Sequence, residues 1–122
     1  MKLIKLVDVE KQERNDGRTV RRLLKENMGI EINEVQILYV THPPGLIEAL
    51  HSHQKSFEIL YFLDKAKYKI NNKDYEIDEG DLVVFEPQDI HGAIAVPHQV
   101  RLLVIQAPAI TDDKNYEENA VS

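Results

Sequence analysis

Apolar and polar residues alternate in short runs along most of this chain, as is typical of β-strands with one buried face. The clearest run begins after Glu34, and the turn residues 42–45 end it. Further strands are predicted over residues 47–53, 57–63, 68–70, 75–77, 82–85, 92–96 and 101–106. Residues 18–26 suit either a short helix or a strand, and we interpret them as a strand. Short strands at near-regular spacing predict an all-β, antiparallel sandwich or barrel.

Glycine and proline occur singly between these runs, as expected for one compact domain. The best hairpin is predicted around residues 71–74, Asn-Asn-Lys-Asp, because these residue types tolerate the positive φ of a tight turn. We therefore expect a barrel over residues 18–110, preceded by an N-terminal strand or arm at residues 1–17. Residues 111–122 carry four carboxylates and few apolar groups, which predicts a mobile acidic tail.

Composition narrows the function. The 122 residues include no cysteine, which excludes thiolate metal ligands and thiol nucleophiles. No signal-like segment and no apolar run of membrane-spanning length occurs, so we expect a cytoplasmic protein without membrane contact. The net charge of −6 argues against nucleic acid as a partner. The basic residues Arg18, Arg21 and Arg22 are interpreted as a solvated strand face.

Three histidines and one glutamate suggest a metal site. His51 and His53 lie two positions apart, so one strand presents both on the same face. Glu58 is the only charge in an apolar strand, where burying it without a partner costs several kcal/mol. His91 follows a turn and arrives from another strand. Alternatively, His51 and His53 lie on a solvated face, His91 caps a turn, and Glu58 pairs with a lysine such as Lys67.

The order of these residues resembles the two motifs of the cupin family. The first motif is matched from Gly45 through the His-x-His pair to Glu58, and the second from Gly80-Asp81 to His91. Lys65, Glu86 and Gln88 stand where the family usually has glycine, proline and glycine. The resemblance implies a double-stranded β-helix, the jelly-roll or cupin barrel. It also implies that His51, His53, Glu58 and His91 bind one divalent transition metal: Fe, Mn, Ni, Zn, Co or Cu.

The resemblance favours a metal-dependent enzyme acting on a small organic molecule, of dioxygenase, decarboxylase, isomerase or lyase type. Glu86 and Asp89 flank the expected metal and are candidates for general acid or base. The main alternative is a non-enzymatic module that binds or senses a sugar or carboxylate. A weaker one is a metal-free sugar-nucleotide isomerase, whose phosphates would need Arg21, Arg22 or Arg101.

The remaining residues of interest are predicted to have structural positions, at the surface, in the barrel or at a subunit contact. His42 and His98 match no motif position and lie beside prolines, so both are predicted to be surface residues. Four apolar residues are expected to line or fill the barrel: Leu60, Phe62, Ala93 and Ala95. Exposed sheet edges are commonly covered by a second subunit, so a homodimer is expected, with residues 1–17 as a covering segment.

Overall fold

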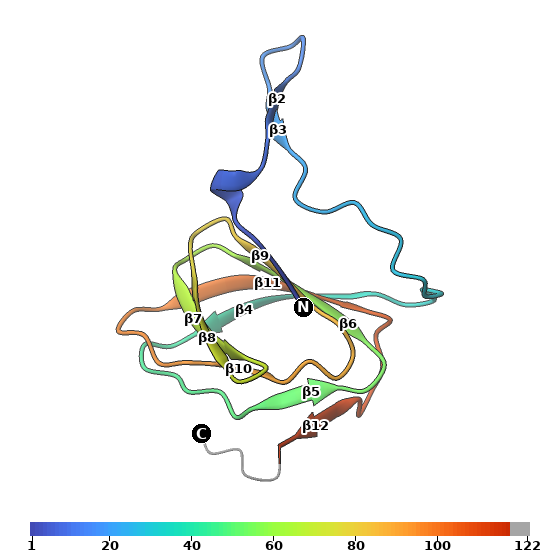
Figure 1. The fold of residues 1–122 in the computed structure, drawn as a ribbon, viewed down its shortest axis with the longest axis vertical. Helices are drawn as coiled ribbons and strands as arrows, with labels where there is room; N and C mark the ends of the chain where they lie inside the picture. Colours follow the sequence, from blue (N-terminus) through green and yellow to red (C-terminus); the bar gives the residue numbers. More distant parts are fainter. Residues whose placement is uncertain (118–122) are drawn as a thin grey trace.

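The computed structural model describes residues 1–117, which form two facing five-stranded sheets and one separate hairpin (Figure 1). The first sheet has the order β1 (Lys2–Ile4), β9 (Leu82–Phe85), β6 (Phe57–Phe62), β11 (Val100–Ala107) and β4 (Gln36–His42). The second has the order β12 (Lys114–Tyr116), β5 (His51–His53), β10 (His91–Ala93), β7 (Ala66–Ile70) and β8 (Lys73–Ile77). All strand pairs are antiparallel, which confirms the predicted fold class.

The remaining elements belong to the N-terminal segment. A 3₁₀ turn, η1 (Leu6–Asp8), follows β1 and leads to the hairpin of β2 (Lys11–Glu13) and β3 (Thr19–Arg21). Figure 1 shows this hairpin standing away from the two sheets. Over residues 1–117, no helix is long and apolar enough to cross a membrane.

The core lies between the two sheets, because side chains at alternate positions of each strand face inward. On the first sheet Leu60 pairs with Val83 and Val104, and Phe62 pairs with Leu102. Leu60, Phe62, Val83 and Leu102 are buried, as are Tyr68, Ile70 and Ile77 of the second sheet and Ala93 of β10. The predicted barrel residue Ala95 is instead exposed, because β10 ends at Ala93 and Ala95 lies in the following loop.

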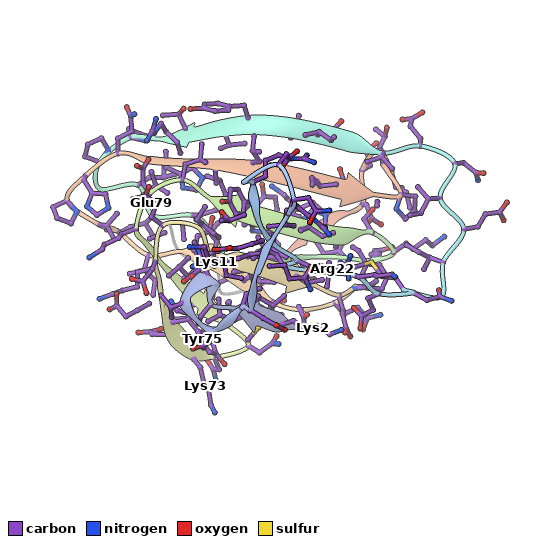
Figure 2. The ribbon with its side chains drawn as sticks, turned by 90° about the horizontal axis from the view of Figure 1, so that it is seen from above. Lys2, Lys11, Arg22, Lys73, Tyr75 and Glu79 are labelled. Atoms are coloured by element: carbon purple, nitrogen blue, oxygen red, sulfur yellow. The ribbon has the colours of Figure 1, made fainter. Side chains whose placement is uncertain are left out.

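The predicted hairpin joins β7 to β8 through a two-residue turn. Asn71 and Asn72 have φ values of +45° and +74°, which an asparagine side chain tolerates better than most. Lys73, expected in the turn, is the first residue of β8 and lies at the tip of this hairpin (Figure 2). The local sequence signal therefore located the turn to within two residues.

Other strand boundaries differ from the expected ones. Only residues 51–53 of the predicted strand 47–53, and only 19–21 of segment 18–26, are strand. Within the expected tail, β12 pairs with β5, because the three-residue strand β5 has a free edge that accepts backbone hydrogen bonds. The rest of that tail, residues 118–122, lies outside the described residues.

Asp81 anchors the first strand. Its buried carboxylate accepts hydrogen bonds from the backbone N–H groups of Leu6 and Asp78, at 3.0 and 2.7 Å, and pairs with the Lys5 ammonium. Gly80 precedes it with φ of +88°, and an added Cβ would lie 2.5 Å from Leu6 Cδ2. The predicted Gly80-Asp81 turn thus holds β1 and η1 against the sheet.

Candidate metal centre

The four predicted ligands come from three strands in two sheets. His51 and His53 lie on β5, His91 on β10 and Glu58 on β6 of the opposite sheet. His91 pairs with His51, and Glu58 pairs with the buried Phe85, so all four side chains face the interior. His53 and Glu58 are five positions apart and would face opposite sides of one continuous strand, but residues 54–56 form the corner between the sheets and reset the alternation.

The three histidines form a buried cluster. Their exposed fractions are 3% for His51, 7% for His53 and 1% for His91. One ring nitrogen from each lies within 4.8 Å of the others. A divalent ion holds imidazole nitrogens at about 2.0–2.2 Å, so its ligand atoms lie roughly 3–4 Å apart. The cluster could therefore close around a single metal ion with small side-chain movements.

Backbone contacts orient two of these rings. His51 Nδ1 donates to the carbonyl of Ala49 at 2.8 Å, and His91 Nδ1 donates to the carbonyl of Asp89 at 3.0 Å. Each bond fixes the proton on Nδ1 and leaves Nε2 with a free lone pair, as in many metal sites. The Phe85 ring stacks on His91 with centroids 3.7 Å apart.

Some buried nitrogens of the cluster lack hydrogen-bond partners within residues 1–117. These are both ring nitrogens of His53 and Nε2 of His91. A buried polar atom without a partner costs about 1–3 kcal/mol, so native proteins rarely keep one without a function. Metal coordination supplies the missing partner for Nε2 of His91 and for one nitrogen of His53, so the donor set fits a metal ion.

Glu58 lies against two of the histidines. Its carboxylate oxygens are 2.9 Å from His53 Nε2 and 3.4 Å from His91 Nε2, although the directions are not those of hydrogen bonds. Burial acts to raise the pKa of Glu58, but the two imidazoles outweigh it and hold the pKa well below its usual range. Lys67, the alternative partner, pairs with Glu76 at 3.1 Å. Glu58 is thus an anion among the histidines.

A cavity of about 150 Å³ opens beside the cluster. Besides three of the predicted ligands it is lined by apolar residues and by several polar ones: Leu38, Val40, His42, Glu48, Leu60, Tyr68, Leu102, Val104 and Lys114. His42, predicted to be a surface residue, is half-buried, because β4 extends to His42 and turns it to the same face as Val40. Burial lowers the pKa of His42.

Burial shifts the pKa of two further groups at the cavity. It lowers the pKa of His51, although the hydrogen bond to the Ala49 carbonyl acts in the opposite direction. It also raises the pKa of Tyr68 well above 10, helped by the charges of Glu48 and Glu58. Tyr68 therefore keeps its phenolic proton, and its ring packs between Phe62 and Phe85.

The two candidate acid–base residues lie elsewhere. Glu86 is exposed, and Asp89 accepts hydrogen bonds from the Glu86 backbone N–H and the Asn71 side chain. Neither lines the cavity. Asp89 instead braces the turn that delivers His91, while His98 is exposed as expected and contacts the carbonyl of Lys65.

The departures from the motif have different structural meanings. Gln88 has φ of +74°, so this position keeps the left-handed backbone that favours glycine, and its N–H donates to the carbonyl of His53 at 2.7 Å. Lys65 has no positive φ, so the turn before β7 needs no glycine. Glu86, at the usual proline, is simply exposed.

Sequence reasoning missed Glu48 and Lys114. Glu48 lies in a loop, where its carboxylate accepts a hydrogen bond from the Ala93 N–H at 3.2 Å. Lys114 lies on β12, within the segment expected to be a tail. An alternation of polar and apolar residues marks neither position.

No protein-family model and no curated protein matches this chain. Solved structures do match. An uncharacterized conserved protein with a double-stranded β-helix domain from Klebsiella pneumoniae subsp. pneumoniae MGH 78578 aligns with a TM-score of 0.63 and 22% identity, over 74% of this chain and 80% of that one. KdgF from Halomonas sp. aligns with a TM-score of 0.60 and 16% identity, over 89% and 94%.

DMSP lyase DddQ from Ruegeria pomeroyi DSS-3 aligns with a TM-score of 0.62 and 19% identity. The match covers 69% of this chain but only 43% of the lyase, so this chain corresponds to less than half of that protein. At these identities the likeness concerns the fold. This chain therefore has the double-stranded β-helix fold of the cupins, with three buried histidines gathered inside it.

Proposed function

We propose that this protein is a metal-dependent enzyme acting on a small organic molecule, with one divalent transition metal held by His51, His53, Glu58 and His91. The observation that carries the proposal is the group of buried imidazole nitrogens without hydrogen-bond partners beside an ionised glutamate. Three neutral imidazoles and one carboxylate form a donor set that suits Fe, Mn, Co, Ni, Cu or Zn.

The surrounding residues suit chemistry as well as binding. A bound metal supplies Lewis-acid polarisation of a substrate oxygen or activation of dioxygen. His51, His53, Glu58 and His91 would hold the ion, and a small substrate would bind to it from the side of the cavity. Apolar side chains form part of the cavity wall, and Tyr68 places a protonated phenol among the lining groups.

The reaction class is best approached through the structural neighbours. DddQ is named as a lyase, so the same fold carries lyase chemistry, and elimination reactions are the first to test here. Dioxygenase, decarboxylase and isomerase activities follow. Fold alone does not choose among them.

The proposal is tested by elemental analysis of protein purified without chelator, beside the double variant His51→Ala/His53→Ala. We expect about one equivalent of a transition metal in the wild type and almost none in the variant. His98→Ala is the matched control, because this exposed histidine lies outside the cavity. Absence of metal from wild-type protein, even after reconstitution with iron, manganese, nickel and zinc, would contradict the proposal. Ligand binding without turnover in loaded protein would favour a sensing module.

We also propose a homodimer and a cytoplasmic location. Ile37 and Tyr39 are 66% and 60% exposed and share the outer face of β4, an edge strand of the first sheet. Exposed apolar side chains on an edge strand favour contact with a second copy. A chain without cysteine suits a reducing compartment.

A further inference from the structure

The C-terminal strand β12 forms one lip of the candidate metal centre. Lys114 pairs with His53, and Tyr116 pairs with His51. Residues directly opposite each other in an antiparallel pair lie on the same face, with Cβ atoms about 4.5–5.5 Å apart. The side chains of Lys114 and Tyr116 therefore leave β12 on the face that carries the two histidines.

The contacts of these two side chains agree with that placement. The Tyr116 ring centroid lies 5.9 Å from that of His51, and Lys114 Nζ lies 5.5 Å from the Tyr116 ring centroid. Lys114 lines the cavity, and Tyr116 is 62% exposed. Among residues 1–117, no carboxylate lies within ion-pair distance of Lys114. The ammonium is thus available to an anion that enters the cavity.

The charges around the cavity favour a bound molecule that carries one negative charge. Glu48 and Glu58 contribute −2, Lys114 contributes +1, and a divalent metal would contribute +2, which leaves +1. Histidines that hold a metal ion are neutral, and burial lowers the pKa of His42, so the imidazoles add nothing to this sum. A bound molecule with a charge of −1 balances the net charge of +1, whereas a dianion or a cation does not.

The remaining walls set the size and polarity of the molecule. A cavity of about 150 Å³ has room for a small organic molecule. Five apolar side chains line it: Leu38, Val40, Leu60, Leu102 and Val104. A short molecule with one anionic end and an apolar body fits such a cavity.

We infer that the substrate of this centre is a small monocarboxylic acid, whose carboxylate meets Lys114 at the lip formed by β12 while its apolar body enters the cavity. The inference rests on the proposed function, because the charge balance includes the metal. Lys114 acts here as a specificity-determining residue and takes no part in bond making.

The test compares an acid with its neutral counterpart on metal-loaded protein. Butyrate and butyramide are titrated calorimetrically into the wild type, Lys114→Gln and the control Lys55→Gln, whose lysine lies outside the cavity. We expect the wild type and the control to bind butyrate about tenfold more tightly than butyramide, the effect of one charge-assisted contact. Lys114→Gln should remove most of this preference and keep its full metal content.

Two failures are distinguishable. Equal binding of acid and amide, binding of neither, or an unchanged preference in Lys114→Gln would overturn the inference and leave the metal proposal standing, provided that metal content stays near one equivalent. Protein that holds no metal after reconstitution would overturn both, because the cavity would then carry a net charge of −1.

Discussion

The ring of Phe85 lies flat on the imidazole of His91, with centroids 3.7 Å apart and planes inclined by only 6°. Phe85 is 1% exposed, so its own position is fixed by the core. The Nδ1 hydrogen bond to the Asp89 carbonyl fixes the remaining rotation of the imidazole. The core and this hydrogen bond thus fix the orientation of the His91 imidazole in the candidate metal centre.

Phe85→Leu should therefore weaken metal binding by about tenfold, at the lower end of what loss of an outer-shell contact costs. Competition with a chromogenic chelator measures the affinity. Phe62→Leu is the control, because Phe62 is equally buried but packs edge-on against Tyr68. Equal losses of affinity in both variants would show that core volume matters and that the stacking does not.

Removing the metal should lower the free energy of unfolding. An ion present at one hundred times its Kd stabilises the folded state by about 2.7 kcal/mol, which corresponds to a melting temperature change of roughly 10 °C in a domain of this size. Thermal unfolding with and without EDTA measures this change. The variant His51→Ala/His53→Ala should melt at the same temperature in both conditions, and a chelator response in that variant would contradict the assigned ligands.

The ion pair of Asp64 with Arg101 should make stability depend on pH in the acid range. Arg101 Nε and Nη2 donate to the carboxylate at 2.8 and 2.9 Å, and these bonds lower the pKa of Asp64 from 3.8 to about 2. Since the folded pKa lies below the unfolded one, the stabilisation is complete above about pH 4 and is lost as the pH falls to 2.

Asp64→Asn should flatten that part of the pH profile, and the difference should shrink in high salt because Asp64 is partly exposed. Urea unfolding at pH 5, 3.5 and 2.5 measures the slope. If stability in the variant depended on pH as steeply as in the wild type, other carboxylates would control the loss of stability at acid pH.

Asp113 should stabilise the corner between the two sheets. Its buried carboxylate accepts hydrogen bonds from the backbone N–H groups of Lys55 and Ser56, both at about 3 Å. Asp113→Ala leaves these donors without a partner and should cost about 2 kcal/mol in urea unfolding. Asp113→Asn keeps one acceptor oxygen and should cost less. Because this corner connects His53 to Glu58, wild-type metal affinity in Asp113→Ala would be unexpected.

The proposed dimer predicts a sedimentation mass of twice 14.1 kDa at micromolar concentration. Tyr39→Glu places a charge on the exposed outer face of β4 and should produce a monomer. Lys73→Glu, at the tip of the β7–β8 hairpin (Figure 2), should leave the mass unchanged. A wild-type mass equal to one chain would rule the dimer out.

Strand alternation explains why much of the fold could be predicted from the sequence. The face shared by His51 and His53 follows from their spacing alone, and the charge of Glu58 within an apolar run indicates a buried partner. His42 was equally accessible to this reasoning, because it follows Leu38 and Val40 at intervals of two. The adjacent prolines instead suggest a surface loop, although His42 is the last residue of β4.

Other features depend on contacts that leave no local signal. β12 has three residues in an acidic segment, and it is a strand because β5 offers it an unpaired edge. Glu48 lies in an irregular loop that packs on Gly92, where an added Cβ would lie 2.6 Å from the Glu48 carbonyl oxygen. Contacts in the tertiary structure therefore place both of these cavity residues, Lys114 on β12 and Glu48 in its loop. The alternation of polar and apolar residues does not indicate such contacts.

The pairing of β1 with β9 has a consequence for the order of folding. Leu3 pairs with Val83, eighty positions later, whereas the β7–β8 hairpin closes through two residues. The hairpin forms in microseconds, while sheets of such long-range pairing take milliseconds to seconds. On a ribosome adding roughly 5–20 residues per second, β1 waits about 4–16 s for its partner strand. During that interval Leu3 and Ile4 are free to meet a chaperone or a neighbouring nascent chain.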